Sequence, residues 1–448
     1  MKHLPVSAFS AALGSLLLLS ACQTPGNPIL NLRQPVQMNR ASVSAQNAQA
    51  GGPTIRVQDP SQLTVPGEIV VRYRPGLNAQ SRMQIMQQFQ LSSIRSIGHP
   101  EMGIELLKAP EMATQAAIEA LNNNPAVLYA EPNFVVSIPQ VLPGDVPQRP
   151  NPRNTYPNDE MFASQYAHQV SNSQAGWQLT RGDRRTVLAV IDTGVDSQHP
   201  DLAAKMLPGF DAITGSNDAK DEHGHGTHCA GIAAALTNNG VGIAGFAPEV
   251  SILPVRVLDA RGSGTSADVA AGTIWAADNG ADVISMSLGG RANPKVKEDS
   301  IKHALAKDVV VVAAMGNYGD NSKIFPAAQD GVIAVGATDD ANQRARFSQY
   351  GTWISVSAPG VNILSTFPTN ANNMNRRNYG SISGTSMATP AAAGVAALIR
   401  SQFPDMNREQ VRAQLEQGTD DLGEPGYDIY YGHGRINVAK ALTLPGRR

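Results

Sequence analysis

Strand-length runs of apolar and β-branched residues alternate with helix-like segments over residues 159–445, and this alternation constrains the fold more than any other feature. Several runs are apolar almost throughout, as strands covered on both faces are. The pattern predicts an α/β fold with a doubly wound, mostly parallel sheet, whose catalytic groups lie at the carboxyl ends of the strands. The expected strands are 186–191, 252–258, 283–287, 309–313 and 332–335, and the expected helices include 265–279 and 299–307.

The composition excludes several classes of protein. Only 16% of the 448 residues are charged and the formal net charge is −2, so neither a charged disordered chain nor a nucleic-acid partner is expected. No window of about 18 consecutive apolar residues exists, which argues against a transmembrane helix. The only cysteines are Cys22 and Cys229. Because Cys22 belongs to a leader segment, no intrachain disulfide is expected.

The first residues have the layout of a bacterial export signal. Lys2 supplies a positive charge, and residues 11–19 form a short apolar stretch. The sequence Leu19-Ser20-Ala21-Cys22 resembles a lipobox, after which Cys22 is diacylated and becomes the new N-terminus. Ordinary signal-peptidase cleavage at the same place is the alternative, but Leu19 is large for it. We therefore expect an exported, membrane-anchored precursor with a lipoprotein-type signal peptide over 1–21, a lipid on Cys22 and a flexible tether over 22–65.

A smaller pattern of elements precedes the main one. Strands and helices are expected in the order β-α-β-β-α-β, which predicts a small α+β domain of ferredoxin-like type over 66–138. An unrelated binding module is the alternative interpretation. Six prolines over 139–158 indicate an exposed linker, where proteolytic processing concentrates. The expected strands are 68–74, 104–107, 127–129 and 134–136, and the expected helices are 79–91 and 112–123.

Three segments of the larger region carry side chains suited to catalysis. Asp192 stands where a buried strand stops, and His225 precedes a helix expected from Ala230. Ser386 opens another helix, with Pro390 in its first turn. Each has an ordinary alternative: a strand-end cap, part of a His-x-x-His zinc pair, or a helix N-cap. Zinc is disfavoured because the H-E-x-x-H spacing is missing, and the G-x-S-x-G elbow of α/β-hydrolases is absent. The chain order Asp, His, Ser is that of subtilisin.

The segments DTGVDSQHPDL, HGTHCAG and GTSMATP resemble the three signatures of the subtilisin-like serine proteases, the subtilases. The resemblance covers about 159–445, and its details are similar to the thermitase branch. The sequence AIEALNNNPAVLYAEPN resembles the end of a subtilase propeptide. The resemblance implies a subtilisin-like catalytic domain over 159–448 and a propeptide that acts in cis as folding chaperone and inhibitor. It also implies a monomeric serine endopeptidase of proteins and peptides, made as an autoprocessed zymogen with 139–158 as the processing linker.

The same resemblance implies roles for single residues. His225 is the general base for Ser386, and Asp192 orients the imidazole, in a reaction that passes through an acyl-enzyme. Asn317 is the expected oxyanion donor, with an Asx turn as the alternative role. Tyr318 stands where some subtilases carry an acid, so we expect a preference for apolar or aromatic substrate side chains. The residues expected to contact substrate are Ser287, Leu288, Gly289, Gly262, Ser263, Gly264, Ala314 and Gly316.

Calcium is the structural cofactor that the resemblance implies. Loop 236–243 is similar to the family's high-affinity site, and hard cations of this kind need several oxygen ligands. A glycine-rich turn without an ion is the alternative. The implied ligands are the side chains of Asp159, Asp201 and Asn239 and the carbonyls of Leu236, Val241 and Ile243.

Other interpretations remain at this stage. A catalytically silent surface lipoprotein would keep the fold as a binding module, although the intact triad and Asn317 argue against it. The 66–138 domain could inhibit other proteases, but its place directly before the linker favours action in cis. Cys229 is either a small buried apolar residue or a reactive thiol. Because Cys22 precedes propeptide and protease, cleavage in the linker would release a soluble extracellular enzyme from the membrane.

Overall fold

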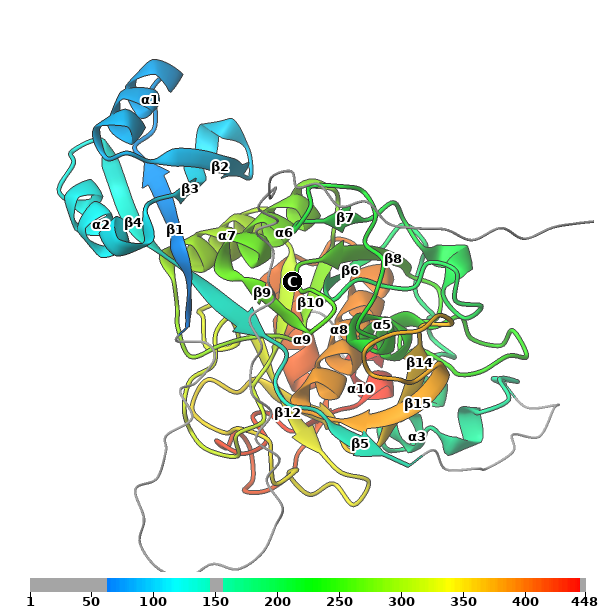
Figure 1. The fold of residues 1–448 in the computed structure, drawn as a ribbon. Coiled ribbons are helices and arrows are strands. Elements are labelled where there is room, and N and C mark those ends of the chain that lie inside the picture. The colour runs from blue at the N-terminus through cyan, green and yellow to red at the C-terminus, as the bar shows by residue number, and fades with distance from the viewer. Residues whose placement is uncertain (1–62, 146–155, 444–448) are drawn as a thin grey trace, which may run out of the picture. The chain divides into compact units, whose positions relative to one another are not determined.

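The computed structural model describes residues 63–145 and 156–443, so the predictions for the signal peptide, for Cys22 and for nearly all of the tether lie outside the described residues. Within those two ranges, no helix is long and apolar enough to cross a membrane. Figure 1 shows an N-terminal antiparallel sheet in blue and cyan, and a larger α/β part in green to red.

The N-terminal domain has the β-α-β-β-α-β order of the ferredoxin-like type, although the elements located in the sequence had one strand too few before α2 and one too many after it. Its strands pair antiparallel in the order β2-β3-β1-β4, the arrangement of a ferredoxin-like sheet. The two strands predicted at 127–129 and 134–136 are one strand, because Pro132 stays in the sheet opposite Ile69, beside an irregularity in the register. The strand β2 was not predicted, since its sequence SSIRSI is mostly polar. The elements are β1 Thr64–Tyr73, α1 Ala79–Gln88, β2 Ser92–Ile97, β3 Ile104–Lys108, α2 Thr114–Asn122 and β4 Val127–Ser137.

The main sheet has nine strands in the order β16-β17-β13-β12-β11-β10-β6-β8-β7. Every pair is parallel except β16 with β17, which confirms the predicted doubly wound sheet. The chain places β8 and β7 on one side of β6 and β10 to β13 on the other, so the carboxyl ends of β6 and β10 border the switch point where such sheets bind ligands. The strands are β6 Val187–Asp192, β7 Phe210–Asp211, β8 Ser251–Arg256, β10 Val283–Met286, β11 Val310–Ala314, β12 Ile333–Thr338, β13 Val356–Pro359, β16 Thr419–Asp420 and β17 Arg435–Ile436.

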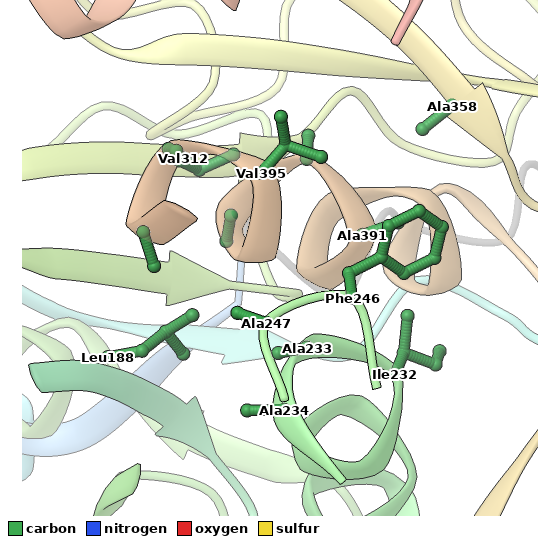
Figure 2. Close-up of a cluster of buried hydrophobic side chains, with 14 of the residues drawn as sticks. Leu188, Ile232, Ala233, Ala234, Phe246, Ala247, Val312, Ala358, Ala391 and Val395 are labelled. Atoms are coloured by element: carbon green, nitrogen blue, oxygen red, sulfur yellow. The ribbon is translucent and has the colours of Figure 1, made fainter. Parts of the chain in front are cut away.

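Helices cover both faces of this sheet. Leu188 and Val190 of β6 belong to a core with α5 and α8, whereas Ala189 and Ile191 belong to a core with α6 and α7. Figure 2 shows small side chains of α5 and α8 around Phe246. Alanine-rich faces of α5 and α8 pack together in this core. The helices are α3 Tyr166–Val170, α4 Ser173–Gly176, α5 His225–Ala234, α6 Ser266–Asp278, α7 Lys295–Ala306, α8 Thr385–Gln402, α9 Arg408–Gln417 and α10 Val438–Thr443.

Two smaller pairings connect the end of the N-terminal domain to the larger part. The strand β4 continues into antiparallel pairing with β9, Ser263–Thr265. Five residues after β4, β5 (Leu142–Gly144) pairs with β15 (Asn378–Ser383), which also pairs with β14 (Ile363–Phe367). The chain therefore crosses the carboxyl-end edge of the main sheet between β4 and β5.

Candidate active site

Asp192 and His225 form a fully buried pair at the end of β6. The Nδ1–H of His225 donates to Oδ1 of Asp192 at 2.8 Å, and the backbone N–H of Thr193 donates to the same oxygen at 2.8 Å. With Nδ1 protonated, the Nε2 atom of a neutral His225 carries a free lone pair. This Nε2 is buried and has no hydrogen-bond partner among the described residues. The arrangement leaves an unoccupied base at the sheet edge.

The electrostatics of this pair favour a strong base. Burial of the imidazole opposes protonation, but the adjacent carboxylate of Asp192 outweighs it and raises the pKa of His225 well above its ordinary value. His225 is the first residue of α5, so the helix begins five residues earlier than the expected start at Ala230. The sequence prediction was wrong because Gly224 and Gly226 near the helix start suggested a loop rather than the first turn.

Ser386 lies in the first turn of α8, and both of its polar oxygens face Ser287. The Ser386 hydroxyl donates to the Ser287 carbonyl at 3.2 Å, and the Ser287 hydroxyl donates to the Ser386 carbonyl at 2.8 Å. The structure thus joins His225 to Asp192 but leaves the Ser386 hydroxyl bonded elsewhere. Catalytic hydrogen bonds often form only once substrate is in place, and rotation about the Ser386 Cα–Cβ bond redirects the hydroxyl.

Pro390 lies inside α8 rather than in its first turn, which corrects the sequence prediction. A proline here has no N–H for the carbonyl of Ser386, four residues earlier. That carbonyl instead accepts from the Ser287 hydroxyl and from the Cys229 thiol, whose Sγ lies 3.5 Å away. The missing helical bond therefore ties Ser386 to the end of β10 and to α5.

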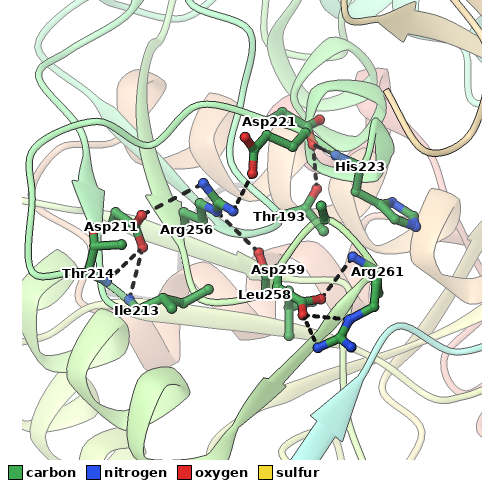
Figure 3. A network of polar contacts seen from close by, with 12 residues as sticks. Thr193, Asp211, Ile213, Thr214, Asp221, His223, Arg256, Leu258, Asp259 and Arg261 are labelled. Atoms are coloured by element: carbon green, nitrogen blue, oxygen red, sulfur yellow. Dashed lines mark hydrogen bonds and ion pairs between the residues drawn. The ribbon is translucent and has the colours of Figure 1, made fainter. Parts of the chain in front are cut away.

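Asp221 organises the loop that carries His225, and sequence reasoning did not assign it a role. Its buried carboxylate accepts from the Thr193 hydroxyl at 2.9 Å, from the Gly224 N–H at 2.7 Å and from the Thr227 hydroxyl at 2.6 Å. The contacts of Asp221 with Thr193 and His223 are drawn in Figure 3. Asp221 joins the end of β6 to the start of α5, so it positions Asp192 relative to His225. Its place four residues before the H-G-T-H run that begins at His225 was the available signal.

Asn317 follows β11 and is oriented by Thr385. Its Oδ1 accepts from the Thr385 N–H at 2.9 Å and from the Thr385 hydroxyl at 2.8 Å. This leaves the Nδ2 amide to donate, and it donates to the carbonyl of Gln140 at 2.8 Å. The preceding Gly316 has φ +105°, and an added Cβ would meet Oε1 of Gln349 at 1.8 Å, so only glycine fits. The amide is held as a donor at the sheet edge.

Two backbone edges predicted to contact substrate flank the chain that leaves the N-terminal domain. Val135–Ser137 runs antiparallel to Ser263–Thr265, and the Gly289 N–H donates to the Ser137 carbonyl at 3.2 Å. The structure therefore brings 262–264 and 287–289 to either side of one extended segment. Ala314 ends β11 and is buried. Tyr318 is 53% exposed, with the Arg291 guanidinium 5.0 Å from its ring centroid, and the specificity expected from it stays a prediction.

The predicted calcium ligands lie together. Asn239 donates through its backbone N–H to Asp159 at 3.1 Å and through its side-chain amide to Asp201 at 2.8 Å. Leu236 and Ile243 donate backbone N–H groups to the carbonyl and the carboxylate of Asp201. Val241 donates its N–H to the side-chain oxygen of Asn239 at 3.0 Å.

The chemistry of this donor set fits a hard cation. Burial raises the pKa of Asp159 to about 6 and also raises the pKa of Asp201. The carboxylates of Asp159 and Asp201 are both buried beside one oxygen-rich loop. A divalent cation bound there would balance their two negative charges.

His228 and Cys229 are both buried, and each contacts a neighbouring group of the catalytic domain. The His228 Nε2 contacts the carbonyl of Gly380 at 3.1 Å, and burial lowers its pKa to about 3. Cys229 is fully buried, and its Sγ lies 3.8 Å from Nδ1 of His225. Burial raises the pKa of the Cys229 thiol, which matches the small apolar role rather than that of a reactive thiolate.

Comparisons with known proteins place these features in one family. Residues 183–434 match the model of the subtilase family, and residues 53–133 match that of the fervidolysin N-terminal prodomain. The chain is 40% identical over 380 residues to the thermophilic serine proteinase of Bacillus sp. strain AK1, covering 85% of this chain and 88% of that one. It is 45% identical over 287 residues to thermitase of Thermoactinomyces vulgaris, covering 64% of this chain and 99% of thermitase.

A solved structure agrees with both matches. The crystal structure of fervidolysin from Fervidobacterium pennivorans superposes with a TM-score of 0.72 at 27% identity, covering 88% of this chain and 62% of fervidolysin. Fold and site together define a subtilisin-type serine endopeptidase with a prodomain. The chain belongs to the subtilase family, is similar to thermitase and carries a fervidolysin-like N-terminal prodomain.

Proposed function

We propose that Asp192, His225 and Ser386 hydrolyse peptide bonds through an acyl-enzyme. His225 Nε2 accepts the Ser386 proton as Oγ attacks the substrate carbonyl carbon, and the same proton then passes to the leaving amine. Asp192 keeps Nδ1 protonated and stabilises the imidazolium that forms. Water then hydrolyses the ester by the reverse use of the same groups. The observation that carries this proposal is the buried Asp192–His225 pair with its open Nε2, together with Cys229, whose Sγ lies 3.8 Å from His225 Nδ1 and 3.5 Å from the carbonyl oxygen of Ser386.

The oxyanion of the tetrahedral intermediate is stabilised by two donors. One is the side-chain amide of Asn317, whose other end is committed to Thr385. The second is the backbone N–H of Ser386, which lies in the first turn of α8, where N–H groups have no carbonyl of a preceding helical turn to bond. Both donors are positioned before the reaction begins, which is the condition for strong electrostatic stabilisation.

A zymogen route accounts for the chain that occupies the site. The N-terminal domain acts in cis as an inhibitor, and self-cleavage within 139–158 separates it from the catalytic domain. Val135–Ser137 already lies as an added strand on the catalytic domain, which is the recognition mode of an extended peptide.

Replacing the nucleophile tests both catalysis and self-processing. Ser386→Ala is expected to abolish casein hydrolysis and to leave the precursor at full length minus its signal, as read by intact mass. Ser92→Ala, at an exposed position of the N-terminal domain, serves as the matched control. Normal maturation of Ser386→Ala expressed alone would rule out self-processing.

Calcium is the proposed structural cofactor, held by Asp159, Asp201 and Asn239 together with backbone carbonyls of loop 236–243. When bound, the ion would balance the two buried carboxylates and stabilise the loop. Chelation by EDTA is expected to lower the melting temperature of the Ser386→Ala precursor, since a ligand at about 100 times its Kd stabilises a fold by about 2.7 kcal/mol. Asp201→Asn should remove most of this EDTA effect, whereas the exposed Asp218→Asn should retain it. Equal EDTA effects in both variants would contradict the site.

Export and lipid attachment at Cys22 complete the proposed function. The order of lipobox-like segment, prodomain, linker and protease means that one cut in the linker frees the enzyme from its anchor. In fractionated cells, the Ser386→Ala precursor should stay with membranes and the processed wild type should be soluble. Fully processed wild-type enzyme that remains with membranes would contradict release, and labelling with a radioactive fatty acid, compared with Cys22→Ser, tests the lipid.

A further inference from the structure

The segment 138–141 crosses the active site between two paired strands. On one side, the N–H of Ile138 donates to the carbonyl of Gly262 at 3.1 Å, directly after the pairing of β4 with β9. On the other side, Leu142 pairs with Ser383, three residues before Ser386. Backbone pairing on both sides fixes the extended chain like a bound substrate. Only four residues therefore remain as places where the chain meets the nucleophile.

One carbonyl of this segment is distinguished from the others. The Asn317 Nδ2 donates to the carbonyl oxygen of Gln140 at 2.8 Å. An oxyanion donor lies about 2.7–3.1 Å from the carbonyl oxygen of the peptide group that is cleaved. We propose that the bond broken in self-processing is Gln140–Val141, so that the prodomain ends at Gln140 and the enzyme begins at Val141. This inference rests on the proposed function and names its substrate bond.

Space at the leaving side agrees with this assignment. Gly384 borders Val141, because a Cβ added at Gly384 would lie 3.4 Å from Cγ1 of Val141 and 3.1 Å from Nδ2 of Asn317. The Val141 side chain and the Asn317 amide thus both lie next to Gly384. After cleavage, the new amino group of Val141 would lie beside the first turn of α8, the turn that contains Ser386.

Pro139 explains why the Ser386 hydroxyl is bonded away from His225 in the uncut chain. Ser137 and Gly289 form an isolated antiparallel bridge, and the same register carried two residues further would place Pro139 opposite Ser287. Proline has no N–H to donate to the Ser287 carbonyl, which instead accepts the Ser386 hydroxyl at 3.2 Å. Rotation of that hydroxyl toward His225 precedes attack.

The chemical step balances with groups already present. Ser386 Oγ bonds to the carbonyl carbon of Gln140 as its proton passes to His225 Nε2. The C–N bond to Val141 then breaks, and the proton goes from His225 to the new amine. Water hydrolyses the Gln140 ester, giving a Gln140 carboxylate and free Ser386.

The first cut is identified by the C-terminus of the released prodomain, which later trimming of the enzyme does not alter. Purified wild-type precursor is sampled over time at low protein concentration, which favours cleavage within one molecule. It should yield a prodomain fragment whose intact mass corresponds to a C-terminus at Gln140. The partner fragment should begin VLPGDV at early times. A first fragment ending elsewhere in 139–158 would overturn the assignment while leaving self-processing intact. A precursor that is never cut, like Ser386→Ala, would overturn both.

A pair of proline variants tests the same bond from the leaving side. Val141→Pro turns the scissile amide into a tertiary amide with a ring that crowds the site, so the fragment ending at Gln140 should be lost. Asp145→Pro, just beyond β5, is the matched control and should still release that fragment. Melting of both variants in the Ser386→Ala background separates loss of cleavage from loss of folding. Release of the Gln140-ended fragment from folded Val141→Pro at the wild-type rate would contradict the proposal.

Discussion

At the scale of single residues, neighbouring side chains bond one polar atom of Asn317 and one of His225, and this leaves the other polar atom of each residue available. Thr385 takes both lone-pair directions of the Asn317 carbonyl oxygen, so only the amide faces the cleft. Asp192 accepts a hydrogen bond from Nδ1–H of His225, so only Nε2 is left to act as a base. Side chains that are fixed in advance need no reorganisation in the transition state, which is the source of their catalytic value.

Asn317→Ala removes the proposed side-chain oxyanion donor. Loss of one such donor in a subtilisin costs about 2.7–4 kcal/mol, so kcat should fall about 100- to 1000-fold with KM little changed. The measurement is steady-state kinetics on a chromogenic peptide, with the melting temperature as a check on folding because Thr385 loses two bonds. A kcat within a few-fold of wild type would show that Asn317 has only a structural role.

The pH dependence follows from the raised pKa of His225. A raised pKa means that the imidazole stays protonated to higher pH, and a protonated imidazole cannot accept the Ser386 proton. The kcat/KM profile of the mature enzyme should therefore lose activity as pH falls, with the midpoint of its acid limb above 6.5, the ordinary value for histidine. A midpoint at or below that value would contradict the electrostatic role assigned to Asp192.

At the scale of elements, the site depends on how closely two helices approach. The α5 and α8 helices carry His225 and Ser386 in their first turns, and both present alanine and glycine to each other. A Cβ added at Gly394 of α8 would lie 2.8 Å from the carbonyl oxygen of Ala233 in α5. Small side chains let the two backbones approach, and this approach sets the separation of His225 from Ser386.

Gly394→Ala tests this packing against intrinsic helix preference. Alanine favours a helix over glycine by about 1 kcal/mol, but overpacking of a close contact costs about 1–3 kcal/mol. We expect a net loss of stability and a lower melting temperature in the Ser386→Ala background, which avoids autolysis. Gln402→Ala, at an exposed position near the end of α8, is the control and should be nearly neutral. A stabilised Gly394→Ala protein would disprove the close-approach argument.

At the scale of the whole molecule, the prodomain completes helices of the catalytic domain. The N-cap residue of α7 is Pro294, which offers no side-chain cap, and the Glu131 carboxylate accepts from the N–H groups of Lys295 and Val296 at 2.8 Å each. Asn133 accepts from the N–H of Ala267 in the first turn of α6 at 3.1 Å. Prodomain side chains thus supply caps at the positive ends of two helices.

Glu131→Gln should weaken the hold of the cleaved prodomain on the enzyme. The amide keeps the shape but loses the charge and one acceptor, a change worth about 1 kcal/mol, or roughly a fivefold weaker complex. Once the precursor has been fully cleaved, casein hydrolysis begins only after the prodomain dissociates. This lag should be shorter in Glu131→Gln than in the wild type. Glu119→Gln is the control and should keep the wild-type lag, because the exposed Glu119 carboxylate accepts from the side-chain amide of Gln115 at 2.9 Å within the same helix. Equal lags in Glu131→Gln and the wild type would show that Glu131 does not strengthen the binding of the cleaved prodomain.

Local patterns predicted the elements wherever periodicity was strong, as in the apolar run of β6. They failed at β2, which is polar, and at β4, which was expected as two strands but continues through Pro132 as one. The start of α5 at His225 was missed for a similar reason, since glycines on either side weakened the helical signal. These errors share one cause, namely that tertiary pairing overrides local preference.

The sequence by itself determined the sheet class, the prodomain topology and the family, because periodicity and motif order are properties of the chain. The tertiary structure alone decided which carbonyl meets Asn317, how Asp221 bridges Thr193 and Gly224, and where Ser386 directs its hydroxyl. These contacts join residues far apart along the chain, and their geometry depends on distances of tenths of an ångström. No periodicity encodes such distances, since only the packed fold sets them.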